Sequence, residues 1–165
     1  MPESVRDEVD ELVAAWRRER PDLDVAPMEM LSRISRLAQR LDRVRSAAFA
    51  THGLESWEFD VLAALRRSGP PYRLSAGQLV RETRVTSGTM TNRVDRLEGR
   101  GLVAREDHPE DRRGVLVRLT EAGALVVDAA LTDLLDAERR MVEPVDRADR
   151  DQLVANLRSL LSPRP

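Results

Sequence analysis

The side chains that could do chemistry in this sequence are arginines and short hydroxyl or amide groups, while most of the usual catalytic groups are missing. All 27 basic residues are arginine, so there is no lysine for a Schiff base, a P-loop or a kinase site. There is no cysteine, which excludes thiolate catalysis, disulfides and cysteine-ligated metals. His52 and His108 are the only imidazoles, and they lack metal-ligand spacing. We therefore expect no enzyme, no metal site and no cofactor.

The arginines are concentrated in the middle of the chain. Residues 31–80 contain eight arginines and four acidic residues, residues 81–120 contain nine and seven, and both ends are acidic. A basic middle could meet a polyanion while the ends meet a second copy of the chain. The alternative is that arginine-rich helices are simply solvated. With only five aromatic residues, recognition of single-stranded RNA or DNA by base stacking is not expected.

Length and hydropathy favour one soluble domain with a substantial core. The chain has 165 residues, of which 41% are hydrophobic and 34% charged. No apolar run approaches the roughly 20 residues of a membrane helix, and the first ten residues do not form a secretory signal. We expect a cytoplasmic protein with no membrane partner.

Apolar spacing predicts a mainly α-helical protein. The first helix ends before Pro21, the second begins at Pro27 and stops at Gly53, and the third is capped by Ser56 and broken by the SGPP sequence. After Thr120, which can act as an N-cap, a long helix extends to about residue 143, and a last helix ends at about residue 161.

The stretch from residue 75 to 120 has the spacing of a helix-turn-helix followed by a β-hairpin. Ser75 can cap a short helix, AGQLVRET, and Thr86 or Ser87 can cap a longer one with an apolar inner face, Met90, Val94 and Leu97. After Gly101, LVARED and VLVRLT are predicted as two strands around the turn-rich sequence HPEDRRG. Alternation in the second strand predicts that Val115, Val117 and Leu119 share one face. A hairpin directly after a helix-turn-helix is a wing.

This region resembles the MarR family of transcriptional regulators. GLVAREDHPEDRRGVLVRLTEAG, residues 101–123, is similar to the family's D-x-R wing followed by L-T-x-x-G, and TMTNRVDRLEGRGL is similar to its recognition helix. The resemblance covers about residues 27–161 and implies a homodimer with N- and C-terminal dimerisation helices and two winged helices on a pseudo-palindromic operator. It divides the chain into an additional N-terminal helix at 1–20 and a MarR-type domain at 27–161, with a DNA-binding lobe at about 54–120.

Short polar side chains at the start of the predicted recognition helix could approach the major groove and the phosphates. The candidates are Ser87, Thr89, Thr91, Asn92 and the cation Arg93. At the wing tip, Arg112 and Arg113 could enter a narrow minor groove, and the family pattern favours Arg113. The alternatives are that the hydroxyls only cap the helix and that the two arginines pair with nearby acids on a solvated hairpin.

A narrower resemblance concerns a ligand. The extra N-terminal helix and the set Trp16, Asp60, Arg93 and Arg105 are similar to the subgroup of MarR proteins that release DNA on binding urate. Close relatives of that subgroup respond instead to citrate or trans-aconitate. The resemblance implies that Trp16 and Arg93 contact the ligand and that an arriving anion displaces Asp60 from Arg105.

Each of these four residues also has an ordinary structural explanation. Trp16 continues an apolar stripe, Asp60 lies in a first helical turn, Arg93 could bind phosphate, and Arg105 could face solvent on a strand. The sequence thus favours a ligand-responsive repressor that a small anion releases from operator DNA. The alternatives are a winged-helix DNA-binding protein without an effector and a helical protein-interaction module.

Overall fold

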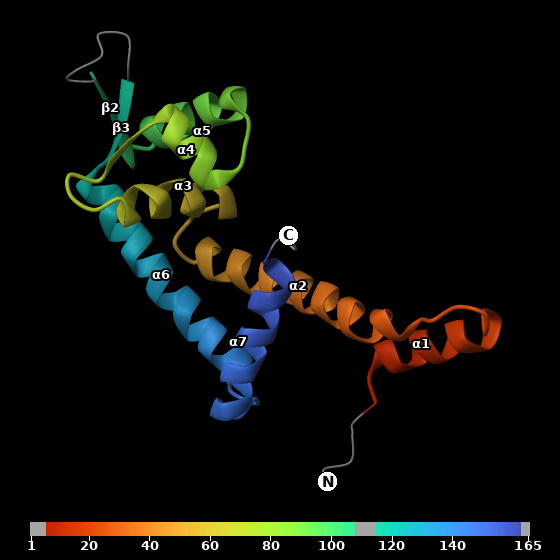
Figure 1. The fold of residues 1–165 in the computed structure, drawn as a ribbon. Coiled ribbons are helices and arrows are strands. Elements are labelled where there is room, and N and C mark those ends of the chain that lie inside the picture. Colours follow the sequence, from red (N-terminus) through yellow and green to blue (C-terminus); the bar gives the residue numbers. More distant parts are fainter. Residues whose placement is uncertain (1–5, 108–114, 163–165) are drawn as a thin grey trace. The chain divides into compact units, whose positions relative to one another are not determined.

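Residues 6–107 and 115–162 are described by the computed structural model, and most of them are helical (Figure 1). The helices are α1 (Glu8–Glu19), α2 (Ala26–Ala50), α3 (Ser56–Arg67), α4 (Ala76–Thr83), α5 (Ser87–Gly99), α6 (Glu121–Val142) and α7 (Arg147–Leu161). The strands are β1 (Arg73–Ser75), β2 (Val103–Asp107) and β3 (Val115–Leu119). Among the described residues, no helix is long and apolar enough to cross a membrane. The chain divides into two units, residues 1–43 and 44–165.

In the N-terminal unit, charge and a small apolar cluster join α1 to the first part of α2. Asp7 caps α1 by accepting the backbone N–H groups of Val9 and Asp10 at 2.8 and 3.2 Å. Val9 and Val13 are buried in a cluster with Val25. The two helices are therefore joined on one side by apolar contact and on another by the ion pairs described below.

The second unit has one continuous core, formed by α3 to α6 and the sheet. Its fully buried side chains include Leu62, Leu65, Leu79, Met90 and Leu97. The sheet order is β1-β3-β2, with both pairs antiparallel, so β3 is the central strand. The mainly helical winged-helix fold predicted from the sequence is confirmed, and β1 is a strand that the sequence did not predict.

Two local predictions are wrong. Glu55, not Ser56, caps α3: its extended backbone begins the helix, and its N–H donates to Oε2 of Glu58 at 2.9 Å. Ser56 instead shares a hydrogen bond of 3.1 Å with the hydroxyl of Ser46. In β3, Leu116 is buried and Val115 exposed, so the strict alternation fails. A central strand is covered on both faces, whereas its end beside the hairpin tip is not.

Candidate nucleic-acid interface

Helices α4 and α5 form a helix-turn-helix whose ends are fixed by capping. The hydroxyl of Ser75 accepts the N–H of Gln78 at 3.3 Å, and Oε1 of Gln78 accepts the N–H of Ser75 at 2.8 Å. Arg84 adopts the left-handed conformation, with φ of 54°, and turns the chain between the helices. Thr86 then caps α5 by accepting the N–H of Thr89 at 3.3 Å. The predicted cap at Ser75 is confirmed, and of the two residues predicted as possible caps of α5, Thr86 and not Ser87 is the cap.

The polar residues predicted to contact DNA are exposed at the start of α5. They are Ser87, Thr89, Thr91 and Asn92, and they lie off the buried stripe of Met90, Val94 and Leu97. Thr89 shares a hydrogen bond of 2.9 Å with the Thr86 hydroxyl, and Thr91 donates to the Ser87 carbonyl at 3.1 Å. These hydroxyls keep acceptor capacity outside the helix. The structure thus presents a polar helix N-terminus to solvent while its opposite side is packed.

The wing strands β2 and β3 are paired from Val103↔Leu119 to Asp107↔Val115. Arg112 and Arg113, predicted for the minor groove, lie outside the described residues. Across the sheet, Glu106 pairs with Arg118 of β3 and lies 4.0 Å from Arg73 of β1. The strands that carry the tip are therefore joined by ion pairs as well as by the backbone ladder.

Asp60 and Arg93, two of the four predicted ligand residues, belong to one electrostatic group. Although Asp60 is exposed as a residue, desolvation of its carboxylate by the surrounding protein raises its pKa. Arg93, Arg45 and Arg67 oppose that rise. The Asp60 carboxylate is therefore harder to ionise than usual in spite of the favourable charges of these three arginines.

Arg105 is held elsewhere. Its Nη2 donates to Oδ1 of Asp95 at 2.5 Å, its Nη1 donates to Glu98, and its backbone N–H donates to Glu98 at 3.0 Å. These partners raise the pKa of Arg105, and the largest contribution is the hydrogen bond that Arg105 donates to Asp95. No hydrogen bond or ion pair joins Asp60 to Arg105 in the part of the chain that the structure describes. The expected Asp60–Arg105 pair is therefore absent here, because two carboxylates of α5 lie closer to the β2 arginine.

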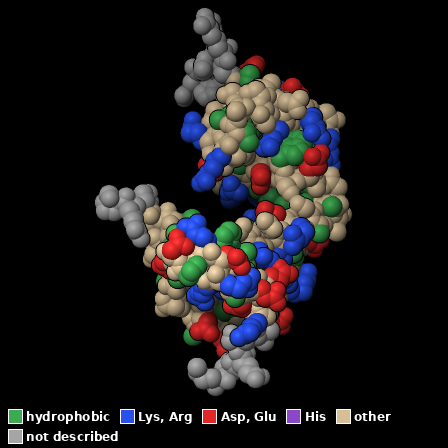
Figure 2. All heavy atoms as spheres, turned by 90° about the vertical axis from the view of Figure 1, so that its right-hand side faces the viewer, with side chains coloured by type: hydrophobic (Ala, Val, Ile, Leu, Met, Phe, Trp, Pro, Cys, Tyr) green, Lys and Arg blue, Asp and Glu red, His purple; other side chains and the backbone are tan. Residues whose placement is uncertain are grey.

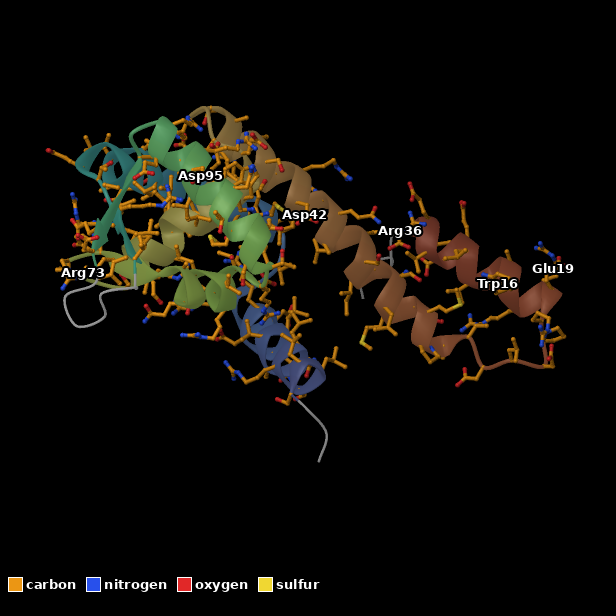
Figure 3. All side chains as sticks on the ribbon, turned by 90° about the horizontal axis from the view of Figure 1, so that it is seen from above. Trp16, Glu19, Arg36, Asp42, Arg73 and Asp95 are labelled. Atoms are coloured by element: carbon orange, nitrogen blue, oxygen red, sulfur yellow. The ribbon has the colours of Figure 1, made fainter. Side chains whose placement is uncertain are left out.

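Trp16 lies on α1 in the N-terminal unit, with 44% of its surface exposed (Figure 3). This exposure does not fit the packing explanation of its apolar stripe, in which Val9 and Val13 are the buried members.

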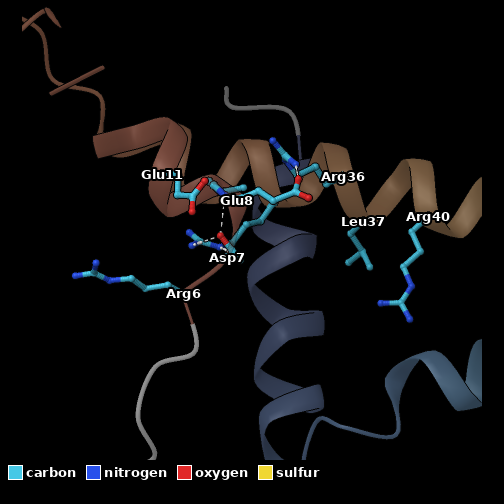
Figure 4. A pocket seen from close by; sticks show the side chains of 9 residues that line it. Arg6, Asp7, Glu8, Glu11, Arg36, Leu37 and Arg40 are labelled. Carbon is cyan, nitrogen blue, oxygen red and sulfur yellow. Dashed lines mark hydrogen bonds and ion pairs between the residues drawn. The ribbon is translucent and has the colours of Figure 1, made fainter. Parts of the chain in front are cut away.

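The N-terminal unit also contains an open hollow of about 680 Å³ between α1 and α2 (Figure 4). Its lining includes four arginines and three carboxylates: Arg6, Arg33, Arg36, Arg40, Asp7, Glu8 and Glu11. Arg33 is already bonded to Asp7, and Arg36 to Glu8. Figure 4 shows Arg6 and Arg40 well apart along the hollow. The arginines do not converge on one point, so this hollow does not have the geometry of an anion site.

Arginines and carboxylates are interspersed on the face drawn in Figure 2. Within the second unit, arginines and carboxylates also form specific pairs, such as the two hydrogen bonds of 2.9 Å from Arg66 to Asp128, which link α3 to α6. The basic middle of the sequence is therefore not one uniform positive surface on that face.

Sequence reasoning missed the contacts between the first turn of α3 and α5. Glu58 is only 2% exposed, and its Oε1 accepts Nη1 of Arg100 at 2.6 Å. The available signal was the spacing of Arg93, Arg96 and Arg100, which places three arginines along one side of a helix.

Comparison with known proteins agrees with this geometry. A family model described as MarR family matches residues 52–114. The transcriptional regulator PecS of Dickeya dadantii is 37% identical over 150 residues, which cover 91% of this chain and 90% of PecS.

Two solved structures are similar in fold. Sco3205 of Streptomyces coelicolor, a MarR family regulator in complex with DNA, has a TM-score of 0.72 and 25% identity, covering 86% of this chain and 95% of its own. BpsR of Bordetella bronchiseptica, whose DNA binding is regulated by 6-hydroxynicotinic acid, has a TM-score of 0.61 and 28% identity, covering 79% and 99%. PecS and Sco3205 are both described as transcriptional regulators. This chain belongs to the MarR family of DNA-binding transcriptional regulators.

Proposed function

We propose that the protein is a homodimeric repressor that binds a pseudo-palindromic operator and is released from it by a small anion. The observation that carries this proposal is the exposed polar N-terminus of α5, placed after a tight turn and in front of a two-stranded hairpin. A helix N-terminus attracts phosphate, and short side chains there allow close approach to base edges. Sco3205, a relative with this fold, has been solved with DNA.

In this proposal, Ser87, Thr89, Thr91 and Asn92 contact the major groove and its phosphates, and Arg112 and Arg113 enter the minor groove. Phosphate contacts would fix the register of the helix, while contacts to base edges would supply specificity. The logarithm of the binding constant should fall linearly with the logarithm of the salt concentration, with a slope of about −0.9 for each phosphate neutralised.

The apolar side of α7 supports the homodimer. None of the residues of α7 is buried, and its exposed apolar side chains recur at helical spacing: Leu153, Val154, Leu160 and Leu161. A stripe of this kind left in water is unfavourable, and a second copy of the chain would cover it. A two-fold dimer would then present two copies of α5 about one DNA turn, ~34 Å, apart.

Asp60 and Arg93 support the effector. An anion near Arg93 would be attracted to it and would raise the energy of the ionised Asp60. Because Arg93 is part of α5, this contact would act directly on the DNA-binding helix. We propose an effector of the urate, citrate or trans-aconitate class, and the regulation of BpsR by 6-hydroxynicotinic acid shows that a relative answers to a small acid. Couplings of this kind typically change affinity by roughly 5–150-fold. Trp16 and Arg105 remain predicted ligand residues.

The test is a fluorescence-anisotropy titration of the protein on the intergenic DNA beside its own gene, at fixed salt, with and without urate, citrate and trans-aconitate. We expect tight, salt-dependent binding that one of these anions reverses. Tight binding that none reverses would favour a regulator without such an effector. Absence of salt-dependent binding to this DNA and to random duplex would contradict the proposal and favour a protein-interaction module.

A further inference from the structure

Two arginines of α5 and its C-cap arginine meet the first turn of α3 on one side of the DNA-binding helix. Arg93, Arg96 and Arg100 are spaced by three and four residues, so they share a helix face. The helices α3, α4 and α5 lie together in the second unit (Figure 1). The three arginines therefore connect the helix that reads DNA to a helix that does not.

At the C-terminal end of α5 the connection is an ion pair between the buried Glu58 and Arg100, whose side chain is 41% exposed. Arg100 donates from Nη1 to Oε1 of Glu58 at 2.6 Å and from Nη2 to the carbonyl of Gly53 at 3.0 Å. Glu58 also accepts the N–H of Glu55, so both of its oxygens are used. A buried carboxylate with two fixed donors holds this end of α5 at one position.

In the last turn of α5 the connection is a closed set of three side chains, Glu55, Trp57 and Arg96. Arg96 lies over the ring of Trp57, 4.7 Å from its centre, and its Nη2 donates to Oε1 of Glu55 at 2.6 Å. The other oxygen of Glu55 accepts Nε1–H of Trp57 at 2.8 Å. These two hydrogen bonds, from Trp57 first and Arg96 second, lower the pKa of Glu55. Each of the three residues thus orients the other two.

Towards the DNA-binding end the connection is weaker. Arg93 lies over the same Trp57 ring at 5.4 Å, with no hydrogen bond or ion pair among the described residues. Apolar packing of Met90, Val94 and Leu97 holds α5 to the core but has little directional preference. Directional contacts refine the rotation of α5 about its own axis. Arg100 supplies them at the C-terminal end, and Glu55, Trp57 and Arg96, whose ion pair lies at the surface, supply the ones nearer to the DNA-binding end.

We propose that Glu55, Trp57 and Arg96 act as positioning residues for operator recognition, setting the rotation of α5 and so the discrimination between operator and other DNA. This inference rests on the proposed function. Phosphate contacts tolerate a small rotation, whereas contacts to base edges do not. Loss of the set should therefore reduce binding to operator more than binding to random duplex.

The variants that test this are Trp57→Leu, which removes the ring, Trp57→Phe, which keeps a ring but removes the N–H donor, and Arg96→Lys, which keeps the charge but loses the planar group. Affinity for operator and for random duplex of the same length is measured across a salt series. Arg139→Gln is the control, because it removes a charge from an exposed ion pair within α6. Thermal melting shows which variants are folded.

We expect the ratio of operator to random affinity to fall by about tenfold in Trp57→Leu and Arg96→Lys, comparable to the loss of one good base contact, with an unchanged salt slope. Trp57→Phe should lie between these and the wild type. Combining Trp57→Leu with Arg96→Lys should add little further loss, because both break one set. The control should keep the wild-type ratio.

Two results would overturn the inference. If the variants melt earlier but keep the wild-type ratio, the set only stabilises the fold. If Arg96→Lys binds operator like the wild type while Arg96→Gln loses affinity for both DNAs and has a smaller salt slope, Arg96 is a phosphate contact. If Trp57→Leu does not fold, the ratio of operator to random affinity in Trp57→Phe and Arg96→Lys decides between these outcomes. A wild type that does not prefer operator would instead reject the proposed function, and this inference with it.

Discussion

At the scale of single residues, the glycine of the L-T-x-x-G motif is required by a close approach of two backbone segments. Thr120 caps α6 by accepting the N–H of Gly123 at 3.0 Å, and its own N–H donates to the carbonyl of Leu102 at 3.2 Å. A Cβ on Gly123 would clash with that same carbonyl oxygen and press on the Leu119 side chain. The motif therefore marks the junction of the wing with α6 and not a contact with DNA.

Gly123→Ala should lower the free energy of unfolding by about 1–3 kcal/mol, because the clash is with backbone that cannot rotate away. Gly99→Ala is the matched control. It lies in α5 with open space around its Cβ, and the change should stabilise the protein by about 0.5–1 kcal/mol. Urea denaturation of both variants checks this. Equal effects of the two changes would show that the close approach is not a constraint.

Asp60 supplies a second prediction at this scale, with a defined pH dependence. The pKa of Asp60 is raised in the folded protein, so its ionised form opposes folding. That penalty is absent well below the ordinary pKa of 3.8 and develops as the pH rises through the folded value. Asp60→Asn should therefore gain stability relative to the wild type as the pH rises, by no more than about 1 kcal/mol because the group is partly solvated.

The same variant should also respond less to the releasing anion, because the charge that the anion repels is gone. Its operator affinity should remain close to that of the wild type. Unfolding curves between pH 3 and pH 8 and an effector titration on operator DNA measure the two effects. A release curve that overlays the wild type would remove Asp60 from the switch, whatever its effect on stability.

At the scale of elements, the sequence predicts every helix and both wing strands, because caps and apolar spacing are local signals. Thr86 and Thr120 cap their helices as expected. Strand β1 was missed because three residues are too few to show alternation, and it exists only through its pairing with β3. The cap of α3 was assigned wrongly because a glutamate three residues inside the helix bonds back to Glu55, which sequence preference for serine does not reveal.

The candidate site was predictable to a smaller extent. The polar start of α5 follows from local spacing, and the structure exposes it as expected. The partners of Arg105 and the contacts of Trp57 depend instead on how α3, α5 and β2 pack, and no local pattern carries that information. The family resemblance implied a pair between Asp60 and Arg105. In the structure, Arg105 pairs instead with Asp95 and Glu98.

The attachment of α1 to α2 gives a prediction at the element scale. Arg33 donates to Asp7 from Nε and Nη2 at 2.8 and 3.0 Å and to Asp10 at 2.8 Å. The hydrogen bond from Arg33 is the main reason that the pKa of Asp7 falls to about 2. Ionised Asp7 therefore stabilises the attached α1 above its ordinary pKa of 3.8, and this contribution is lost as the pH falls from there to about 2.

We expect the protection of the α1 amides, measured as the slowing of exchange relative to the intrinsic rate at each pH, to fall over that pH interval. In Asp7→Asn this protection should be low already at neutral pH. Glu19→Gln is the control, because Glu19 pairs only with its exposed neighbour Arg18 among the described residues. It should leave exchange in α1 unchanged. Protection in Asp7→Asn equal to that of the wild type at pH 7 would show that the valine cluster alone holds α1.

At the scale of the whole molecule, the question is what covers the apolar faces that a single chain leaves in water. On α6, Leu131 and Leu135 are exposed one turn apart, and α7 exposes a longer stripe. Such faces are a cost to a monomer and a source of affinity for a dimer. DNA binding by two linked copies of α5 would be much tighter than by one, since the second contact becomes intramolecular.

Leu153→Glu should therefore weaken the dimer by about 100-fold or more. The residue is exposed in the single chain, so the charge costs the folded monomer little. In a two-fold interface the change occurs twice, and each copy buries an unpaired carboxylate.

Ala155→Glu is the control, because it introduces the same charge on the opposite side of α7. Sedimentation over a concentration series, paired with operator titrations, should show Leu153→Glu as a monomer with greatly reduced operator affinity and Ala155→Glu as the wild type. A Leu153→Glu protein that remains dimeric at micromolar concentration would exclude this face of α7 from the interface and leave α6 as the surface to test.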